Sequence, residues 1–265
     1  MKISIFKSIL ALFMAMLLST ATTLANNKNA DKAPDFNFPK TVLSEANASL
    51  QSALKAGNYP DAVKYLIQST LSSAMISQDS IQSIVNRIDS LASTATDEVG
   101  RSVMYYLEAK VLYTYVSFNY NKTADRKSTT SPSNDITEWN KDNFTDTIVS
   151  LAKKSLSCSE ALLATPVDTY YLAKTNDRNI VYPTMFDMLA YNYIDMLSDD
   201  TREFNDSAKL AKSTIDSIYM SLCMLNSDKT APFINASLEY KKWDNNGKMT
   251  KEFAMQLYKE YAGDE

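Results

Sequence analysis

The chain has 265 residues, no histidine, four glycines and a formal net charge of −4. The absence of histidine removes the commonest general base, the Ser-His and Cys-His nucleophile pairs and the preferred zinc ligand. The scarcity of glycine excludes a glycine-rich phosphate-binding loop and disfavours folds built on tight turns. An excess of acids without a run of Lys and Arg argues against nucleic acid as a partner, because phosphate neutralisation requires clustered basic side chains.

The first 25 residues have the layout of a secretory signal peptide. Lys2 and Lys7 give the positive start, and an uncharged apolar stretch follows from Ile9 to Leu18. Small residues then end the segment near Ala25. The alternative is a membrane anchor, which needs about 20 apolar residues, more than this stretch contains. We expect cleavage near Ala25 and a mature protein that is soluble in the periplasm or cell envelope, with membrane contact only through envelope association.

Residues 26–40 are polar and lack periodicity, which predicts a flexible mature N-terminus. Apolar residues then recur at three- and four-residue spacing, the pattern of helices with one buried face. The predicted helices of the first half run from Thr41 to Gly57, from Pro60 through Ala74, from Asp79 to Ala95 and from Asp97 to about Asn121. The last of these is apolar nearly all round and is broken only by residues such as Glu108. It is therefore expected to be central and packed on more than one side.

Residues 122–136 are rich in Ser, Thr, Asp and Lys, and they predict a mobile, exposed loop that buries nothing. Helical patterns resume after it. The predicted segments are a helix capped by Asp142 that fades near Leu163, a short helix from Thr169 to Lys174, a helix opened by Pro183, and two further helices at 206–225 and 251–261.

No segment shows convincing strand alternation, and about eight helices are joined mostly by short loops. The expected fold is all-α, with antiparallel helical hairpins stacked into a bundle or short solenoid over residues 41–262. One hairpin is tetratricopeptide-like, because Gly57, Tyr59 and Ala62 stand in the pattern of that helix pair. A true array should repeat at about 34 residues, and no second copy occurs at that period.

Acidic pairs and single cysteines are the remaining groups that could carry chemistry. Adjacent acids occur at predicted helix ends or at the C-terminus, where capping and solvation explain them. Asp187 and Asp195 share one helix in apolar surroundings, and bonding to a helix end or to Arg178 is the favoured interpretation. Cys158 and Cys223 are either a disulfide of an oxidising compartment or two small buried thiols. We therefore expect no catalytic, cofactor-binding or metal-binding residues.

Four aromatic residues are candidate partner-binding residues, because Trp and Tyr are enriched at the centres of protein interfaces. They are Trp139, Trp243, Tyr105 and Tyr115. The two tryptophans lie beside polar segments, and the two tyrosines lie in the central helix. The alternative for each is ordinary packing against neighbouring helices.

The second half resembles the helical N-terminal region of the large bacterial alpha-2-macroglobulin-like proteins. A Trp-led helix over Trp139–Leu156 is followed by the YYLAK run at Tyr170–Lys174 and by Ile180–Leu197. The residues that match the family's second pattern are Tyr182, Pro183, Thr184, Phe186, Asp187, Leu189 and Ala190. The likeness covers roughly residues 40–260, of which about 40 residues are specific.

This resemblance implies an envelope protein related to proteins that entrap peptidases through a bait segment and, in some members, a thioester. The sequence contains neither a strand-rich region nor a Cys-Leu-Glu-Gln thioester motif. The expected function is therefore a non-catalytic interaction or scaffold module, either cut from a longer product or working with a separate macroglobulin-like partner. The alternative is a freestanding helical-repeat protein that binds a peptide or glycan.

Overall fold

The computed structural model describes residues 34–119, 123–124, 126, 132–170 and 184–197. This part of the chain is all-α, as predicted, and contains seven packed α-helices. Within it no strand forms, and the sole β-type contact is an isolated bridge between Pro166 and Thr184. None of these helices is both long and apolar enough to cross a membrane.

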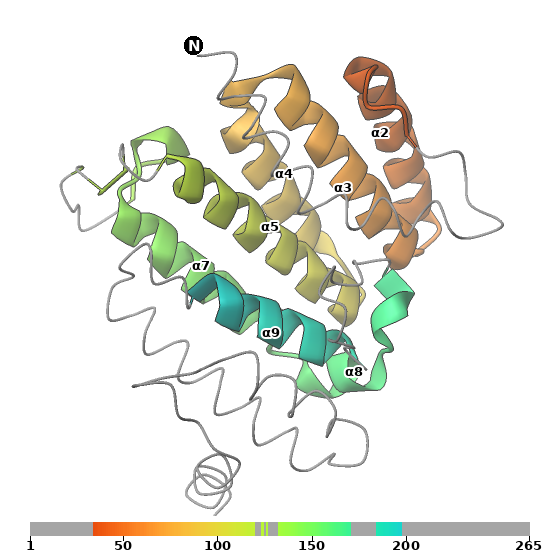
Figure 1. The fold of residues 1–265 in the computed structure, drawn as a ribbon. Coiled ribbons are helices and arrows are strands. Elements are labelled where there is room, and N and C mark those ends of the chain that lie inside the picture. Colours follow the sequence, from red (N-terminus) through yellow and green to blue (C-terminus); the bar gives the residue numbers. More distant parts are fainter. Residues whose placement is uncertain (1–33, 120–122, 125, 127–131, 171–183, 198–265) are drawn as a thin grey trace, which may run out of the picture.

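Helices α2 (Pro39–Lys55) and α3 (Tyr59–Ile76) pack side by side as a hairpin (Figure 1). The predicted end of the first helix is confirmed, since Gly57 adopts a φ of +67°, a conformation that side chains disfavour. Asn58 then caps α3 by accepting a hydrogen bond from the Asp61 amide, 3.2 Å away. The predicted start at Thr41 is wrong, because α2 begins at Pro39, where a missing N–H costs nothing.

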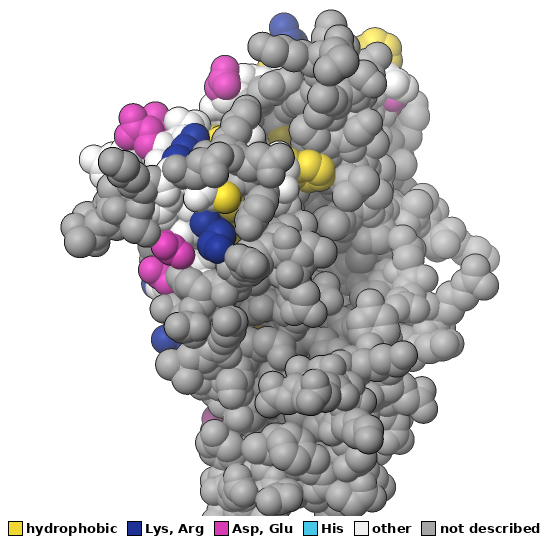
Figure 2. Space-filling model, turned by 60° about the vertical axis from the view of Figure 1, so that its left-hand side comes forward, with side chains coloured by type: hydrophobic (Ala, Val, Ile, Leu, Met, Phe, Trp, Pro, Cys, Tyr) yellow, Lys and Arg dark blue, Asp and Glu magenta, His cyan; other side chains and the backbone are white. Residues whose placement is uncertain are grey.

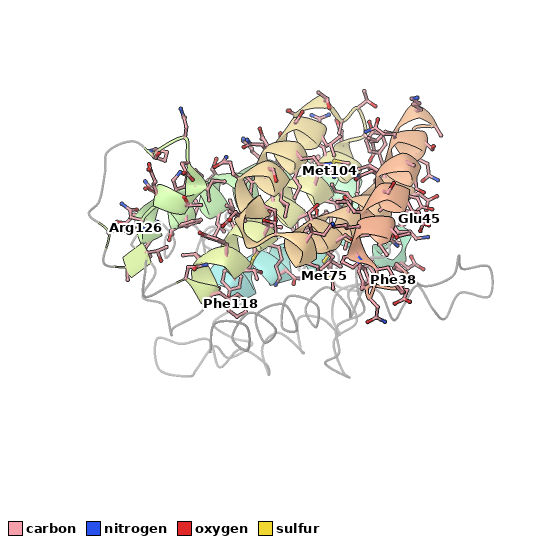
Figure 3. All side chains as sticks on the ribbon, turned by 90° about the horizontal axis from the view of Figure 1, so that it is seen from above. Phe38, Glu45, Met75, Met104, Phe118 and Arg126 are labelled. Atoms are coloured by element: carbon pink, nitrogen blue, oxygen red, sulfur yellow. The ribbon has the colours of Figure 1, made fainter. Side chains whose placement is uncertain are left out.

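Helix α4 (Ile81–Thr94) follows a single 3-10 turn, η1 (Gln78–Ser80), which forms the first turn of the predicted 79–95 helix. Its predicted apolar face is confirmed, since Ile81, Ile84, Val85 and Ile88 are buried. Helix α5 (Glu98–Phe118) lies between α4 and α7 (Figure 1) and buries residues around most of its circumference. It is the central helix that its composition predicts. Met104, labelled in Figure 3, is one of its fully buried side chains.

Helix α7 (Lys141–Ser155) is followed by the short helix α8 (Ser159–Ala164). Two predictions are wrong here. The N-cap is Asn140, whose side chain forms a reciprocal capping box with Asn143, so Asp142 lies inside the helix. The expected single helix to Leu163 also divides at Leu156–Cys158, where the Ser155 hydroxyl donates to the backbone oxygen of Ser102, 2.7 Å away.

The described chain ends with the 3-10 turn η3 (Val167–Tyr170) and helix α9 (Met185–Leu197). Helix α9 begins two residues after the predicted opening at Pro183, and the Met185 amide donates to the Thr165 carbonyl at 2.9 Å. Its predicted inner face is confirmed at the buried residues Met185, Phe186, Leu189 and Tyr193. The predicted helices at 206–225 and 251–261 lie outside the described residues.

One hydrophobic cluster contains residues from both sides of the expected loop at 122–136. Helix α5 packs against α4 on one side and α7 on another. The helical segments before and after that loop therefore share a core.

Candidate functional site

Five residues of α5 recur at alternating four- and three-residue spacing and so lie along one face of the helix. They are Arg101, Tyr105, Glu108, Leu112 and Tyr115, and we call this face the α5 strip. Leu112 and Glu108 are buried, whereas the other three side chains are partly exposed. Two of the residues predicted to bind a partner, Tyr105 and Tyr115, thus share one face of the central helix.

Helix α7 contacts both tyrosines of the α5 strip. The Lys154 ammonium lies 5.3 Å from the ring centroid of Tyr105, within the range of a cation–π interaction. The Tyr115 ring lies 5.7 Å from the Phe144 ring, tilted by 33°. Burial raises the pKa of Tyr115, so this phenol stays protonated and keeps its hydrogen-bonding ability.

Trp139 joins Tyr115 through the same phenylalanine. Its ring meets Phe144 edge-on, with 5.3 Å between centroids. The indole Nε1 donates to the Ser133 carbonyl at 2.6 Å, and the Trp139 carbonyl accepts from Arg126 at 2.7 Å. Trp139 and Tyr115 are partly exposed and Phe144 is fully buried. We call these three residues the aromatic cluster.

The segment before Trp139 is anchored on α4. The 3-10 turn η2 (Ile136–Glu138) places Ile136 in the core, only 2% exposed. Its amide donates to the Gln82 side chain at 2.8 Å. The expectation that residues 122–136 bury nothing is therefore wrong at Ile136, and also at Thr123, which is 1% exposed. The sequence signal for this burial was Ile136 itself, an apolar residue that follows a run of mostly polar residues.

Among the residues that the structure describes, Oε2 of Glu108 has no hydrogen-bond partner, although the residue is only 5% exposed. Burial raises its pKa to about 8, the negative charge of Asp89 adds to the rise, and Lys154 opposes it. This carboxyl is therefore largely protonated at pH 7. Sequence reasoning noted Glu108 only as a break in an apolar surface, but an acid on the buried side of a central helix is itself a signal of function.

Two tyrosines from different elements form hydrogen bonds at the N-terminus of α5. Asp97 caps the helix by accepting from the Gly100 amide, and it also accepts from the Tyr170 hydroxyl at 2.6 Å. The Tyr59 hydroxyl accepts from the Thr96 amide at 2.8 Å. The predicted capping role of the acidic pair at this helix start is confirmed for Asp97.

Several sequence-predicted residues cannot be placed at this site. Trp243, Cys223 and Arg178 lie outside the described residues, and so do the acidic pairs near the C-terminus. The side chains of Asp187 and Asp195 are likewise outside the description. Cys158 is a free thiol, 3.0 Å from the Ser102 hydroxyl. Among the described residues, no group of three or more Cys, Asp and Glu side chains is arranged to hold a metal.

Comparison with known proteins adds no relative: no protein-family model, curated protein sequence or solved structure matches the chain. The likeness to the macroglobulin helical region therefore stays a prediction.

Proposed function

We propose that this chain is a non-catalytic protein-interaction module of the cell envelope that binds its partner through the aromatic cluster. The observation that carries this proposal is the partly buried Trp139. Its ring is packed on Phe144, its Nε1 is bonded to Ser133, and its carbonyl is bonded to Arg126. An aromatic side chain fixed before binding loses little conformational entropy on association, which is a property of interface anchors.

The surroundings of the cluster support the same proposal. Figure 2 shows acidic and basic side chains beside small apolar areas on the described part of the face that it draws. Next to Trp139 in the chain, the polar residues Asp135, Thr137 and Glu138 are exposed. A polar rim around an aromatic centre is the usual anatomy of a transient protein interface.

The proposed location and partner class come from the sequence. The leader-like first 25 residues support export, and N-terminal sequencing of the mature protein should then begin near Asn26. The likeness of residues 139–197 to the macroglobulin helical region supports a macroglobulin-like protein as the partner, either the remainder of a longer product or a separate chain. A sequence beginning at Met1 in protein recovered from the envelope would contradict signal cleavage.

Photo-crosslinking in the full chain tests the binding surface. A benzoylphenylalanine at position 139 is compared with one at Tyr65, a partly buried aromatic of α3 with its own lysine contact at 5.1 Å. We expect an envelope protein to crosslink at 139 and not at 65. The purified partner should bind the Trp139→Ala variant about tenfold or more weakly. Identical adducts at both positions, or unchanged affinity of Trp139→Ala, would contradict the proposal.

A further inference from the structure

Glu108, the buried acid of the α5 strip, does not belong to the aromatic cluster, and the proposed function gives it no role. Buried polar groups in folded proteins are nearly always hydrogen-bonded, since an unpaired one retains its full desolvation cost. Glu108 is 95% buried, yet no described residue forms a hydrogen bond with its Oε2. Two turns earlier on the same face, the buried Nε of Arg101 likewise has no hydrogen-bond partner within the described part of the chain.

The groups around Glu108 differ in charge from one helix to the next. Asp89 of α4 disfavours the Glu108 carboxylate, whereas Lys154 of α7 favours it. Tyr193 of α9 is fully buried, burial raises its pKa well above the usual value, and the charge of Glu108 adds to the rise. Among the described residues no hydrogen bond reaches Oε2 of Glu108, and the Lys154 ammonium lies over the Tyr105 ring.

The position of Lys154 indicates that this face of α5 is suited to binding a cation. Its ammonium is held by a tyrosine ring of the α5 strip, three residues along the helix from the unpartnered carboxyl. A tyrosine face beside a carboxyl group is suited to an ammonium or guanidinium ion, through cation–π attraction and a charge-assisted hydrogen bond. The net charge of −4 also favours a basic partner.

We propose that the α5 strip receives a Lys or Arg side chain of the partner protein, which displaces Lys154 from Tyr105 and pairs with the Glu108 carboxylate. This inference rests on the proposed function and specifies the chemistry of the partner. No covalent bond changes, and the proton that leaves Glu108 on pairing passes to solvent.

The pairing makes binding dependent on pH. The pKa of Glu108, about 8, means that a bound cation must drive deprotonation at pH 7. Affinity should therefore rise between pH 6 and pH 9 and level off once the free carboxyl is ionised. A residue with a purely structural role would not link ligand binding to proton release.

The probe is N-acetyl-arginine N-methylamide, titrated into the full chain and followed by the NMR signals of the Glu108 carboxyl and the tyrosine rings. Its neutral analogue, N-acetyl-citrulline N-methylamide, is the ligand control. Glu108→Gln removes the charge with little change in shape. The matched protein control is Glu45→Gln on the exposed surface of α2, on the opposite side of the bundle from Arg126 (Figure 3).

We expect saturable shifts with the arginine probe, proton release at pH 7, roughly tenfold weaker binding in Glu108→Gln and no change in Glu45→Gln. Lys154→Met removes the competing ammonium but also a charge that lowers the pKa of Glu108, so it is compared at pH 9, where it should bind the probe more tightly. Equal binding of the citrulline analogue, unchanged binding in Glu108→Gln, or weaker binding in Lys154→Met would overturn the inference. Crosslinking at Trp139 would survive such a failure, so this inference and the proposed function fail separately.

Discussion

At the scale of single residues, Glu108 has the clearest consequence for stability. Its folded pKa of about 8 exceeds its ordinary value of 4.5, so the folded state binds the proton more tightly than the unfolded state. The stabilisation by this proton is complete below about pH 4.5 and is lost as pH rises through about 8. Within that window the loss approaches about 1.4 kcal/mol per pH unit.

Glu108→Gln should remove this dependence, because glutamine does not titrate. Urea unfolding at pH 5, 7 and 9 is the measurement, with Glu45→Gln as control. The variant should be more stable than the native chain at pH 9, and the difference should shrink toward pH 5. An equal difference at all three pH values would contradict a buried, titrating Glu108.

Gly100 is fixed by a close helix contact. A Cβ atom at this position would lie 2.8 Å from Cδ1 of Tyr59 and 2.9 Å from Oδ1 of Asp97. We expect Gly100→Ala to lower the free energy of unfolding by roughly 1–3 kcal/mol despite the better helix propensity of alanine. Thermal unfolding measures this, and the loss should shrink in a Tyr59→Ala background, where the ring contact is gone.

Residue types on helix faces could be predicted from the sequence, but individual pairings could not. The buried faces of α4 and α9 follow from apolar spacing alone. The unpaired state of Glu108 does not, because it depends on where Asp89 and Lys154 fall after the helices pack. Likewise, Tyr105 and Tyr115 could be predicted as binding candidates, whereas the contacts with Lys154 and Phe144 required the packed α7.

At the scale of elements, the start of α7 positions the aromatic cluster. Asn140 is 3% exposed and accepts from the Asn143 amide at 2.8 Å, while the Asn143 side chain accepts from the Asn140 amide. This reciprocal cap fixes the first turn of α7, in which Phe144 contacts Trp139. The sequence-based prediction placed the cap two residues too late, because Asp142 and Asn140 are both good capping residues.

Asn140→Ala should therefore lower the free energy of unfolding by about 1 kcal/mol and also loosen the packing of Trp139. Calorimetry measures the first effect, and tryptophan fluorescence quenching by acrylamide measures the second. The control is Asn58→Ala, which removes the cap of α3, where the Asn58 side chain accepts from the Asp61 amide at 3.2 Å. Equal quenching in both variants would contradict a link between this cap and Trp139.

At the scale of the whole molecule, the two helical segments are joined by the shared core and by the bond from Tyr170 to Asp97, which spans 73 residues of sequence. The Tyr170 side chain is 3% exposed. Such a long-range bond cannot be predicted from periodicity, because neither residue belongs to an amphipathic pattern.

Tyr170→Phe should lower the free energy of unfolding by about 1–3 kcal/mol, since it removes a hydrogen bond to a charged acceptor. Unfolding should remain one cooperative transition when it is followed by circular dichroism and by tryptophan fluorescence. Separate transitions already present in the native chain would show that the two segments do not fold as one unit.

The central claim is that this chain acts by binding a protein at the face formed by α5 and the start of α7. Amide hydrogen exchange of the full chain, with and without the protein crosslinked at position 139, tests it most directly. Exchange should slow in the second half of α5, in η2 and in the first turns of α7, and stay unchanged in the α2–α3 hairpin. Protection centred on that hairpin, or none anywhere, would contradict the account.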